Sequence, residues 1–515
     1  MNRRNFILNG VSAMAFVPAL SNSFFSSLSC FTLPGKDFPL CGIGPQQTRL
    51  IIKPIMTNMI HSGVWEGPCR FDVISVEEET RRVHEYFNYW SNNLDSLLGK
   101  LDPEYYTLLE PGLVIFNEDF KIYPDQFQKL EPGAIEADAL LISPDGASIE
   151  TYKIAEKYKK TVISATPLNC RTVDIAAYTR SHGLEMFVPN DPEEMKQVVI
   201  SLRARKILAE TRILYPTDWG WPSVASITGI NEPEKLKDKF GVELVKISYK
   251  ALSDKMEQMT ESSEVNEKAR EWAGLLTGNA DHSYLDEKYV VKSLIFYQCI
   301  IQLMNEYQCN AFTIECFEFC TSKLPQKWEI TPCLIHTLFK DQGIPSACEG
   351  DLAALIGTEL LMSVSGKSSH MGNMFMEENE SLQINHSVPG TRMNGFNEPP
   401  LPYQLGRFVQ SGWGTKFAVD FMNNEEKNVT VIRLNPTADG LLVLKGKLVG
   451  SKGYNEDLLG CSSTAFIVGQ ESRSARKFVE KQVDYGNHLA WVYGDYSEEL
   501  KTLAQMLKLD IEIIT

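Results

Sequence analysis

The stretch Ser346–Leu361 reads SACEGDLAALIGTELL, and its pattern predicts a strand, a tight turn and a buried helix. The apolar segment Ile344–Cys348 is followed by two acids, Glu349 and Asp351, and then by an almost wholly apolar run. A helix that is apolar all round is a buried helix. A strand that leads directly into a helix is the repeating unit of a parallel α/β sheet. The stretch therefore predicts an α/β fold with two carboxylates at the end of a strand.

The same unit recurs upstream, where short apolar segments alternate with helical ones. The predicted strands of these two regions are residues 49–56, 112–116, 137–143, 161–165, 211–215, 242–248, 311–314 and 344–348. Continuous apolar strands separated by helices predict parallel sheets that are covered on both faces. We therefore expect two Rossmann-like parallel-sheet domains, an N-terminal one at 48–210 and a second one at 211–365.

The pattern changes after residue 366, where proline- and glycine-rich turns multiply. Val429–Leu434, Asp439–Gly440 and Leu441–Leu444 form a strand–turn–strand signature. We expect residues 366–515 to be a mostly antiparallel β C-terminal domain. Three domains agree with a chain of 515 residues.

The charge balance excludes one class of partner. The chain has 66 acidic and 50 basic residues, a formal net charge of −16. Proteins that bind nucleic acid or anionic membranes need clustered Lys and Arg. We expect no nucleic-acid partner, and no membrane span, since the N-terminal apolar run is too short for one.

The N-terminus carries a targeting pattern. Arg3 and Arg4 precede a short, weakly hydrophobic run, which resembles a twin-arginine signal over residues 1–35 and predicts a periplasmic or otherwise exported protein. The alternative is an ordinary N-terminal segment, and lipidation of Cys30 stays open. The 11 cysteines are scattered, several in apolar runs, which predicts free buried thiols and no disulfide framework.

Three kinds of side chain are candidates for a site. Glu349 at a strand end is a plausible ligand for a divalent metal, although Glu349 and Asp351 could equally be first-turn charge and N-cap of the helix. His386 and His488 are two of only 8 histidines, and either could instead be a core residue. Trp491 could stack on a sugar face or pack in the β core.

Four motifs together resemble the L-fucose/L-arabinose isomerase family. They are Ala347–Asp351, Gln383–His386, Val429–Leu434 and Gly486–Asp495, within a region from about Ala311 to the C-terminus. The resemblance implies two α/β domains and a β-rich domain, a homo-oligomer, and a small-molecule sugar as partner. It also implies aldose–ketose isomerisation through an enediol at a divalent metal, commonly Mn²⁺.

The resemblance also implies roles for individual residues. Glu349 matches the metal-binding, catalytic glutamate, and His488 matches a C-terminal metal-ligand histidine. His386 matches a histidine that binds metal in arabinose-type members and lies close to the sugar in others. Where many members have a second histidine beside His488, this chain has Leu489.

One position departs from the family pattern. The second catalytic and metal-binding acid of fucose-type members falls on Asn373, and the arabinose-type glutamate falls on Gly372. An asparagine can give an oxygen to a metal, but it cannot carry a proton at neutral pH. The acids at 377, 378 and 380, or His370, are the alternative proton carriers.

Three functions follow as hypotheses. The first is a metal-dependent aldose–ketose isomerase of carbohydrate metabolism. The second is an exported carbohydrate-binding relative that has lost isomerase activity, because of Asn373. The third is an interaction module that kept only the fold.

Overall fold

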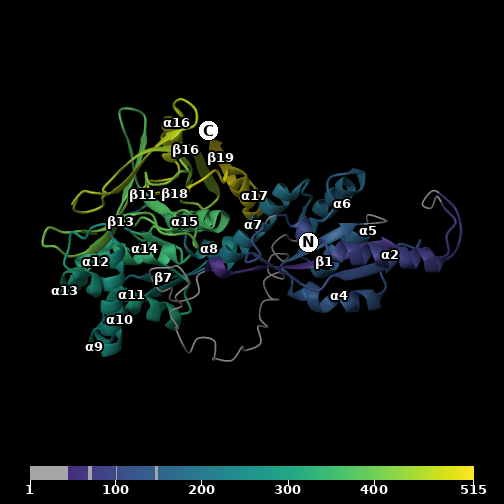
Figure 1. Cartoon of the computed structure of the whole chain (residues 1–515), viewed down its shortest axis with the longest axis horizontal. Coiled ribbons are helices and arrows are strands. Elements are labelled where there is room, and N and C mark those ends of the chain that lie inside the picture. The colour runs from purple at the N-terminus through teal and green to yellow at the C-terminus, as the bar shows by residue number, and fades with distance from the viewer. Residues whose placement is uncertain (1–44, 68–71, 100, 145–148) are drawn as a thin grey trace.

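The computed structural model describes residues 45–515, apart from 68–71, 100 and 145–148. The expected signal segment, with Cys30, lies outside these residues. Three sheets follow one another along the chain (Figure 1). Two are parallel sheets with helices and the third is a mostly antiparallel β structure, so the predicted fold class is confirmed.

The first sheet is parallel, in the order β2-β1-β4-β5-β6, with β3 also paired to β1. Its strands are β1 (Leu50–Met59), β2 (Tyr106–Leu108), β3 (Gly112–Phe116), β4 (Ala139–Pro144), β5 (Thr161–Ser164) and β6 (Met186–Phe187). The helices of this region are α2 (Val76–Ser91), α3 (Leu94–Leu97), α4 (Pro124–Glu136), α5 (Ile149–Tyr158), α6 (Cys170–Ser181) and α7 (Pro192–Ala209). Both faces of β4 are buried, as expected for a parallel strand covered on two sides.

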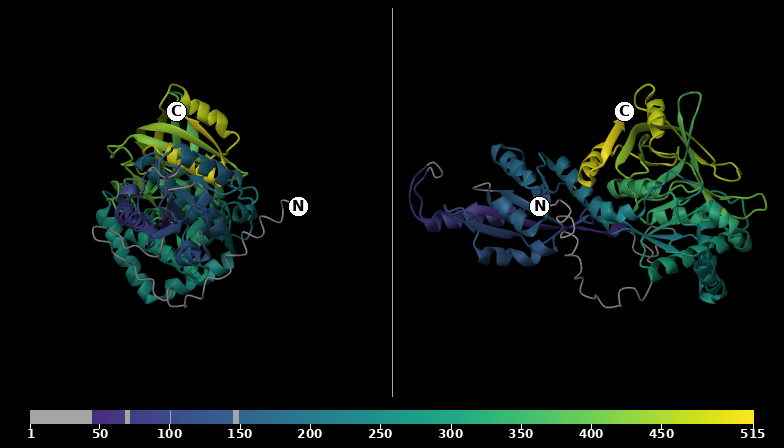
Figure 2. Two further views of the ribbon diagram at one scale, coloured as in Figure 1. Left: turned by 90° about the vertical axis from the view of Figure 1, so that its right-hand side faces the viewer. Right: turned by 180° about the vertical axis from the view of Figure 1, so that it is seen from behind.

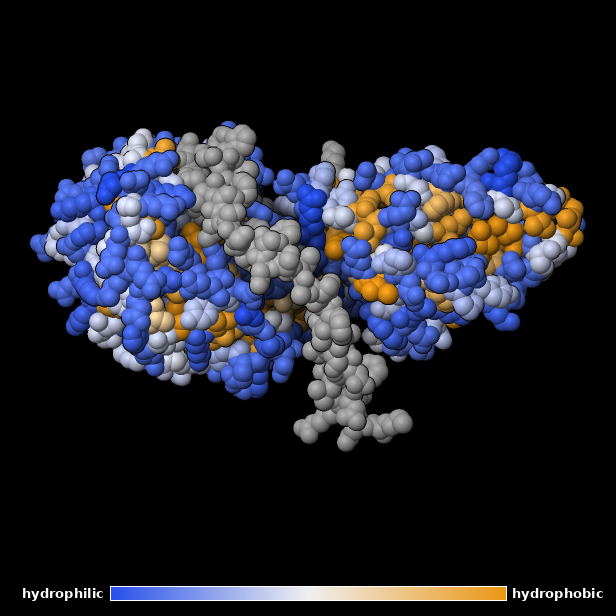
Figure 3. All heavy atoms as spheres, turned by 90° about the horizontal axis from the view of Figure 1, so that it is seen from below, coloured by the Kyte–Doolittle hydropathy of each residue, from blue (hydrophilic) through white to orange (hydrophobic). Residues whose placement is uncertain are grey.

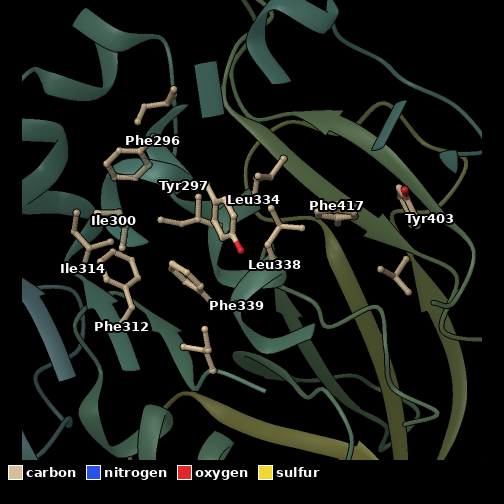
Figure 4. Close-up of a cluster of buried hydrophobic side chains, with 14 of the residues drawn as sticks. Phe296, Tyr297, Ile300, Phe312, Ile314, Leu334, Leu338, Phe339, Tyr403 and Phe417 are labelled. Carbon is tan, nitrogen blue, oxygen red and sulfur yellow. The ribbon is translucent and has the colours of Figure 1, made fainter. Parts of the chain in front are cut away.

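The second sheet is parallel, in the order β10-β9-β7-β8. Its strands are β7 (Arg212–Pro216), β8 (Glu243–Ile247), β9 (Ala311–Ile314) and β10 (Ser346–Cys348). Its helices are α8 (Glu234–Phe240), α9 (Tyr249–Glu261), α10 (Ser263–Asn279), α11 (Glu287–Glu306), α12 (Cys316–Thr321), α13 (Leu324–Trp328) and α14 (Cys333–Asp341). Side chains from α11, β9 and α14 form an aromatic cluster that continues to Tyr403 and Phe417 (Figure 4). The core of this sheet is therefore shared with the region that follows.

The third sheet closes on itself. Its order is β15-β18-β11-β12-β17-β16-β19, and β15 also pairs with β16. The strands are β11 (His370–Met376), β12 (Leu382–His386), β15 (Asn428–Leu434), β16 (Gly440–Lys452), β17 (Ser463–Gly469), β18 (Leu489–Tyr493) and β19 (Asp510–Ile514). A hairpin of β13 (Tyr403–Arg407) and β14 (Thr415–Val419) and two helices, α16 (Ser474–Gln482) and α17 (Ser497–Leu507), complete this region. All its pairings are antiparallel except β16 with β19.

Helix α15 (Leu352–Ser365) joins the three regions. Its residues are buried from Leu352 to Val364, which confirms the prediction of a buried helix from its almost wholly apolar sequence. It packs against α7, β10, β15 and β18. The predicted second domain ends at residue 365, yet this helix lies on the strands of the third sheet. Figures 1 and 2 show the first sheet at one end of an elongated molecule and the other two sheets together at the opposite end.

A membrane or a partner would require particular features of the helices and of the surface. Among the residues that the structure describes, no helix is long and apolar enough to cross a bilayer. Apolar residues do gather on the lobe of the first sheet (Figure 3). Exposed large apolar side chains in this lobe include Phe120, Tyr123 and Ile135, the last at 63% exposure.

A buried acid on α15 predicts a pH-dependent stability. Burial raises the pKa of Glu359 to about 8, and its carboxyl is hydrogen-bonded to Thr211 Oγ1. An unfolded chain ionises this group near its ordinary pKa of 4.5, so the folded state loses stability as the pH rises from 4.5 to 8. We expect Glu359→Gln, a neutral isostere, to stabilise the protein at pH 8 by on the order of 4 kcal/mol, since a pKa difference of one is about 1.4 kcal/mol.

Thermal unfolding at pH 5 and pH 8 measures this effect. The gain of Glu359→Gln should be small at pH 5 and large at pH 8. Glu378→Gln, at an exposed position, serves as the control. An equal gain at both pH values would show that Glu359 is not held neutral by its burial.

Candidate metal centre

Three side chains of ligand type converge from distant parts of the chain. Glu349 follows β10, His386 ends β12 and His488 precedes β18. One ligand atom of each lies within 4.8 Å of the others. His386 Nε2 is 3.3 Å from Glu349 Oε1, and His488 Nε2 is 3.2 Å from Glu349 Oε2. The carboxylate therefore lies between two imidazoles.

A left-handed turn places Glu349. Both Glu349 and Gly350 have φ of +63°. This conformation costs a non-glycine residue on the order of 1 kcal/mol or more and persists only where contacts hold it. The Ser223 hydroxyl donates to the Glu349 carbonyl at 2.6 Å, and the Gly350 N–H donates to the Ile314 carbonyl at 3.2 Å. A Cβ on Gly350 would lie 2.8 Å from the Tyr215 hydroxyl, so this position requires glycine.

Asp351 orients His488. Its Oδ2 is 2.9 Å from His488 Nδ1, and both side chains are fully buried. The same oxygen accepts hydrogen bonds from Arg433 at 2.9 Å and from the Ser226 hydroxyl at 2.5 Å. Arg433 also donates to three backbone carbonyls, including that of His488. A carboxylate at Nδ1 keeps the proton on that nitrogen and leaves Nε2 available as a ligand.

The partner of His386 at Nδ1 is a thiol and not a carboxylate. Its Nδ1 is 3.8 Å from the Cys461 sulfur, and the Ser387 hydroxyl is 3.5 Å from the same sulfur. Both histidines thus have a polar atom at Nδ1, and both turn Nε2 toward Glu349. This orientation is the one found in histidines that bind a metal.

The pKa shifts agree with this geometry. Burial disfavours the ionised form of Glu349, but the imidazoles of His386 and His488 outweigh it and lower the pKa of the carboxyl. For Asp351, the charge of Arg433 and the contact with His488 likewise outweigh burial, so its pKa is also lowered. The pKa of both histidines is raised in spite of burial, that of His386 by Cys461 and Glu349 and that of His488 by the two carboxylates.

The residues present fit a divalent metal. Although His488 Nε2 is close to Glu349, this buried nitrogen makes no hydrogen bond. Two imidazole nitrogens and one carboxylate oxygen are ligands for first-row divalent metals, and three protein ligands leave positions for oxygens of a substrate.

Asn373 lies one strand away from His386, on the other face of the sheet, because it pairs with Asn385, the residue before His386. It is on β11 opposite Asn385 of β12, and its Oδ1 accepts a hydrogen bond of 2.5 Å from Asn487. Asn487 directly precedes His488, and within the described residues no hydrogen bond joins Asn373 to Glu349, His386 or His488. The acids after it lie in a turn, where Glu380 pairs with Arg476 at 3.5 Å.

Trp491 lies in the hydrophobic core. It is fully buried, with ring contacts to Phe421 at 5.2 Å and Tyr493 at 5.1 Å. This position favours the packing role over sugar stacking. His370 is buried against the same indole ring.

Sequence reasoning missed the partners of the two histidines. It treated Asp351 only as an N-cap, a role that the residue does fill by accepting from the Ala354 N–H. The signal for its second role was its place at the same strand end as Glu349. Ser226 and Cys461 had no such signal, because neither belongs to a motif.

The comparisons with known proteins identify distant relatives. No protein-family model matches the chain. Sulfoquinovose isomerases of Priestia aryabhattai and Priestia megaterium are each 23% identical over 337 residues, which is 64% of this chain and 71% of the relative. A sulfoquinovose isomerase of a Clostridium species is 25% identical over 186 residues, 35% of this chain and 40% of the relative. These similarities support a sugar isomerase function.

Asp351→Asn should weaken metal binding. The amide no longer holds the Nδ1 proton of His488 by charge, and loss of such a partner typically costs about 10- to 100-fold in metal affinity. Isothermal titration with Mn²⁺ measures the change. Asp191→Asn is the matched control, because Asp191 also caps a helix, α7, but its side chain accepts from the N–H groups of Glu193 and Glu194 and not from a histidine. Equal affinities in the two variants would refute the orienting role.

Metal binding should weaken as the pH falls. The raised pKa of His386 and of His488 means that a metal must displace protons from them. We expect the logarithm of the Mn²⁺ association constant to rise with pH, with a slope between about one and two, until both imidazoles are neutral. A flat dependence between pH 5 and 8 would mean that neither histidine is a ligand.

Proposed function

We propose that the protein is a metal-dependent aldose–ketose isomerase that works through an enediol. The observation that carries the proposal is the convergence of Glu349, His386 and His488 in a chain related to sugar isomerases. The motifs shared with the L-fucose/L-arabinose isomerase family support the same function. The substrate in this proposal is a free small-molecule sugar.

Glu349, His386 and His488 would hold the metal, Mn²⁺ or another divalent cation. When bound, the metal would polarise two neighbouring sugar oxygens and stabilise the negative charge of the enediol. Glu349 is ionised at neutral pH, because its pKa is lowered, so a carboxylate oxygen can accept the proton from the sugar carbon. In this arrangement His386 belongs with the ligands.

A single carboxylate is sufficient for the proton transfer. The proton removed from C2 can return to C1 on the same face of a planar enediol, while the hydroxyl proton of O2 passes to O1 directly or through solvent. Asn373 cannot act as the base or the acid, because its amide neither gains nor loses a proton at neutral pH in the way that a carboxyl group does. We therefore assign both carbon-bound proton transfers to Glu349 and give Asn373 no part in them.

Three further expectations belong to the same proposal. The chain would divide at about residues 210 and 365 into the two α/β domains and the β-rich domain. It would form a homo-oligomer, and the exposed apolar residues of the first lobe support association. Export through a twin-arginine signal remains a prediction from residues 1–35.

The decisive experiment combines metal analysis with proton exchange. Metal-loaded protein is incubated in deuterated water with a panel of aldoses that includes sulfoquinovose. Nuclear magnetic resonance then follows deuterium at C1 and C2 and the appearance of the ketose. We expect exchange with at least one sugar, a loss of about 10²-fold or more in Glu349→Gln, and no loss in Glu378→Gln.

Two outcomes would change the proposal. A protein that binds no divalent ion cannot work as proposed. A protein that binds metal and sugars but exchanges no proton would be a carbohydrate-binding relative without isomerase activity.

Asn373→Asp tests the departure from the family pattern. In the place that the family resemblance gives to residue 373, a carboxylate would add a negative charge near the centre, so we expect a lower Mn²⁺ dissociation constant, by about tenfold for 1.4 kcal/mol of added attraction. Isothermal titration measures it, with Asn379→Asp in the exposed turn as the control. An unchanged dissociation constant would count against placing Asn373 at the centre.

A further inference from the structure

A pair of thiols adjoins the candidate metal centre through one of its members. Cys348 ends β10 and directly precedes Glu349, and Cys316 begins α12. Their sulfur atoms are 2.9 Å apart, and both cysteines are free thiols. Strands β9 and β10 are parallel neighbours with Cys348 opposite Ile314, so the register of the sheet holds the two thiols together.

The two thiols differ in exposure. Cys316 is half-buried, while Cys348 is 1% exposed. An oxidant from solution therefore reaches Cys316 first, and Cys348 is in place to resolve the product. A disulfide has a sulfur–sulfur distance of about 2.05 Å, so bond formation requires an approach of about 0.9 Å.

We propose that Cys316 and Cys348 form a reversible disulfide that changes the metal affinity of the neighbouring centre. The oxidant is a low-molecular-weight disulfide such as oxidised glutathione. The Cys316 thiolate attacks one of its sulfurs, which forms a mixed disulfide and releases one glutathione. Cys348, after losing its proton to solvent, attacks the Cys316 sulfur, and the second glutathione leaves. Two electrons pass from the cysteines to the oxidant, and two protons end on two glutathione thiols.

The chain transmits the change to the centre. The approach of the sulfurs pulls the end of β10 toward α12, and the next residue is the ligand Glu349. Its left-handed backbone is held by the contacts of Ser223 and Gly350, so the carboxylate has little freedom to compensate. Because binding effects are reciprocal, a bound metal should disfavour the disulfide by the factor by which the disulfide weakens the metal. This coupling rests on the proposed metal function, whereas the disulfide itself does not.

Peptide mapping tests the disulfide. The full chain, free of metal, is incubated with oxidised glutathione, its remaining thiols are blocked, and its peptides are analysed by mass spectrometry. We expect a peptide pair joined through Cys316 and Cys348 that returns to two thiols with dithiothreitol. Cys316→Ser should abolish it, and Cys320→Ser, at the exposed thiol of the same helix, should not. Cys316 found only as a mixed disulfide, or unmodified while Cys320 reacts, would overturn the proposal.

Isothermal titration with Mn²⁺ tests the coupling. We expect the oxidised protein to bind about five- to tenfold more weakly than the reduced protein, with full recovery in dithiothreitol. In Cys316→Ser the same treatment should change nothing. Equal affinities of the two redox forms would overturn the coupling. Absence of Mn²⁺ binding in both forms would overturn the coupling and the proposed function together, while the mapped disulfide would still stand on its own result.

Discussion

The buried contact of Asp351 with Arg433 and His488 is the interaction on which the rest of the site depends. All three side chains are removed from water, so an ionised carboxylate there is stable only because it is fully partnered. Its partners come from the start of α15, from β15, from the approach to β18 and from the loop that contains Ser226. One carboxylate thus joins the second sheet to the third. It also caps the helix that packs on both.

This contact explains why a metal centre can lie between two sheets without a dedicated loop. The second sheet supplies Glu349 at the carboxyl end of β10, the edge at which α/β sheets collect ligands. The third sheet supplies the two histidines at the ends of β12 and β18. Helix α15 is rigid because it is buried along its length, so the distance between the two edges is set by packing. The left-handed backbone at Glu349 persists only because the surrounding contacts offset its conformational free-energy cost.

Much of the architecture could be predicted from the sequence, because the signals are local. Continuous apolar strands and the helix after Asp351 depend on short-range patterns, and the structure has them. Other elements were missed where local signals conflict. Pro132 and Gly133 are typical of a turn, yet both lie inside α4. Strand β11 contains glycine and no regular alternation, and one of its two partners, β18, lies more than 100 residues away in the sequence.

The residues of the site also fall into those that local motifs predict and those that depend on distant contacts. Glu349, His386 and His488 could be proposed from motifs, and the structure brings their ligand atoms together. The role of Asp351 could not be predicted, because it depends on Arg433, 82 residues away, and on His488, 137 residues away. The position of Trp491 was open for a similar reason, since only the closed barrel shows which face of β18 is inside.

The charge of the centre has a consequence for the chemistry. The buried ionised groups Glu349, Asp351 and Arg433 sum to −1 when both imidazoles are neutral. An acid in place of Asn373 would make this −2, which would hold a cation more strongly but oppose the negative charge of an enediol. In the proposed isomerase, with residue 373 placed as the family resemblance implies, an asparagine would give up metal affinity but would not oppose the anion that develops during the reaction. Asn373 is then compatible with catalysis as long as the two oriented imidazoles provide enough affinity to retain the ion.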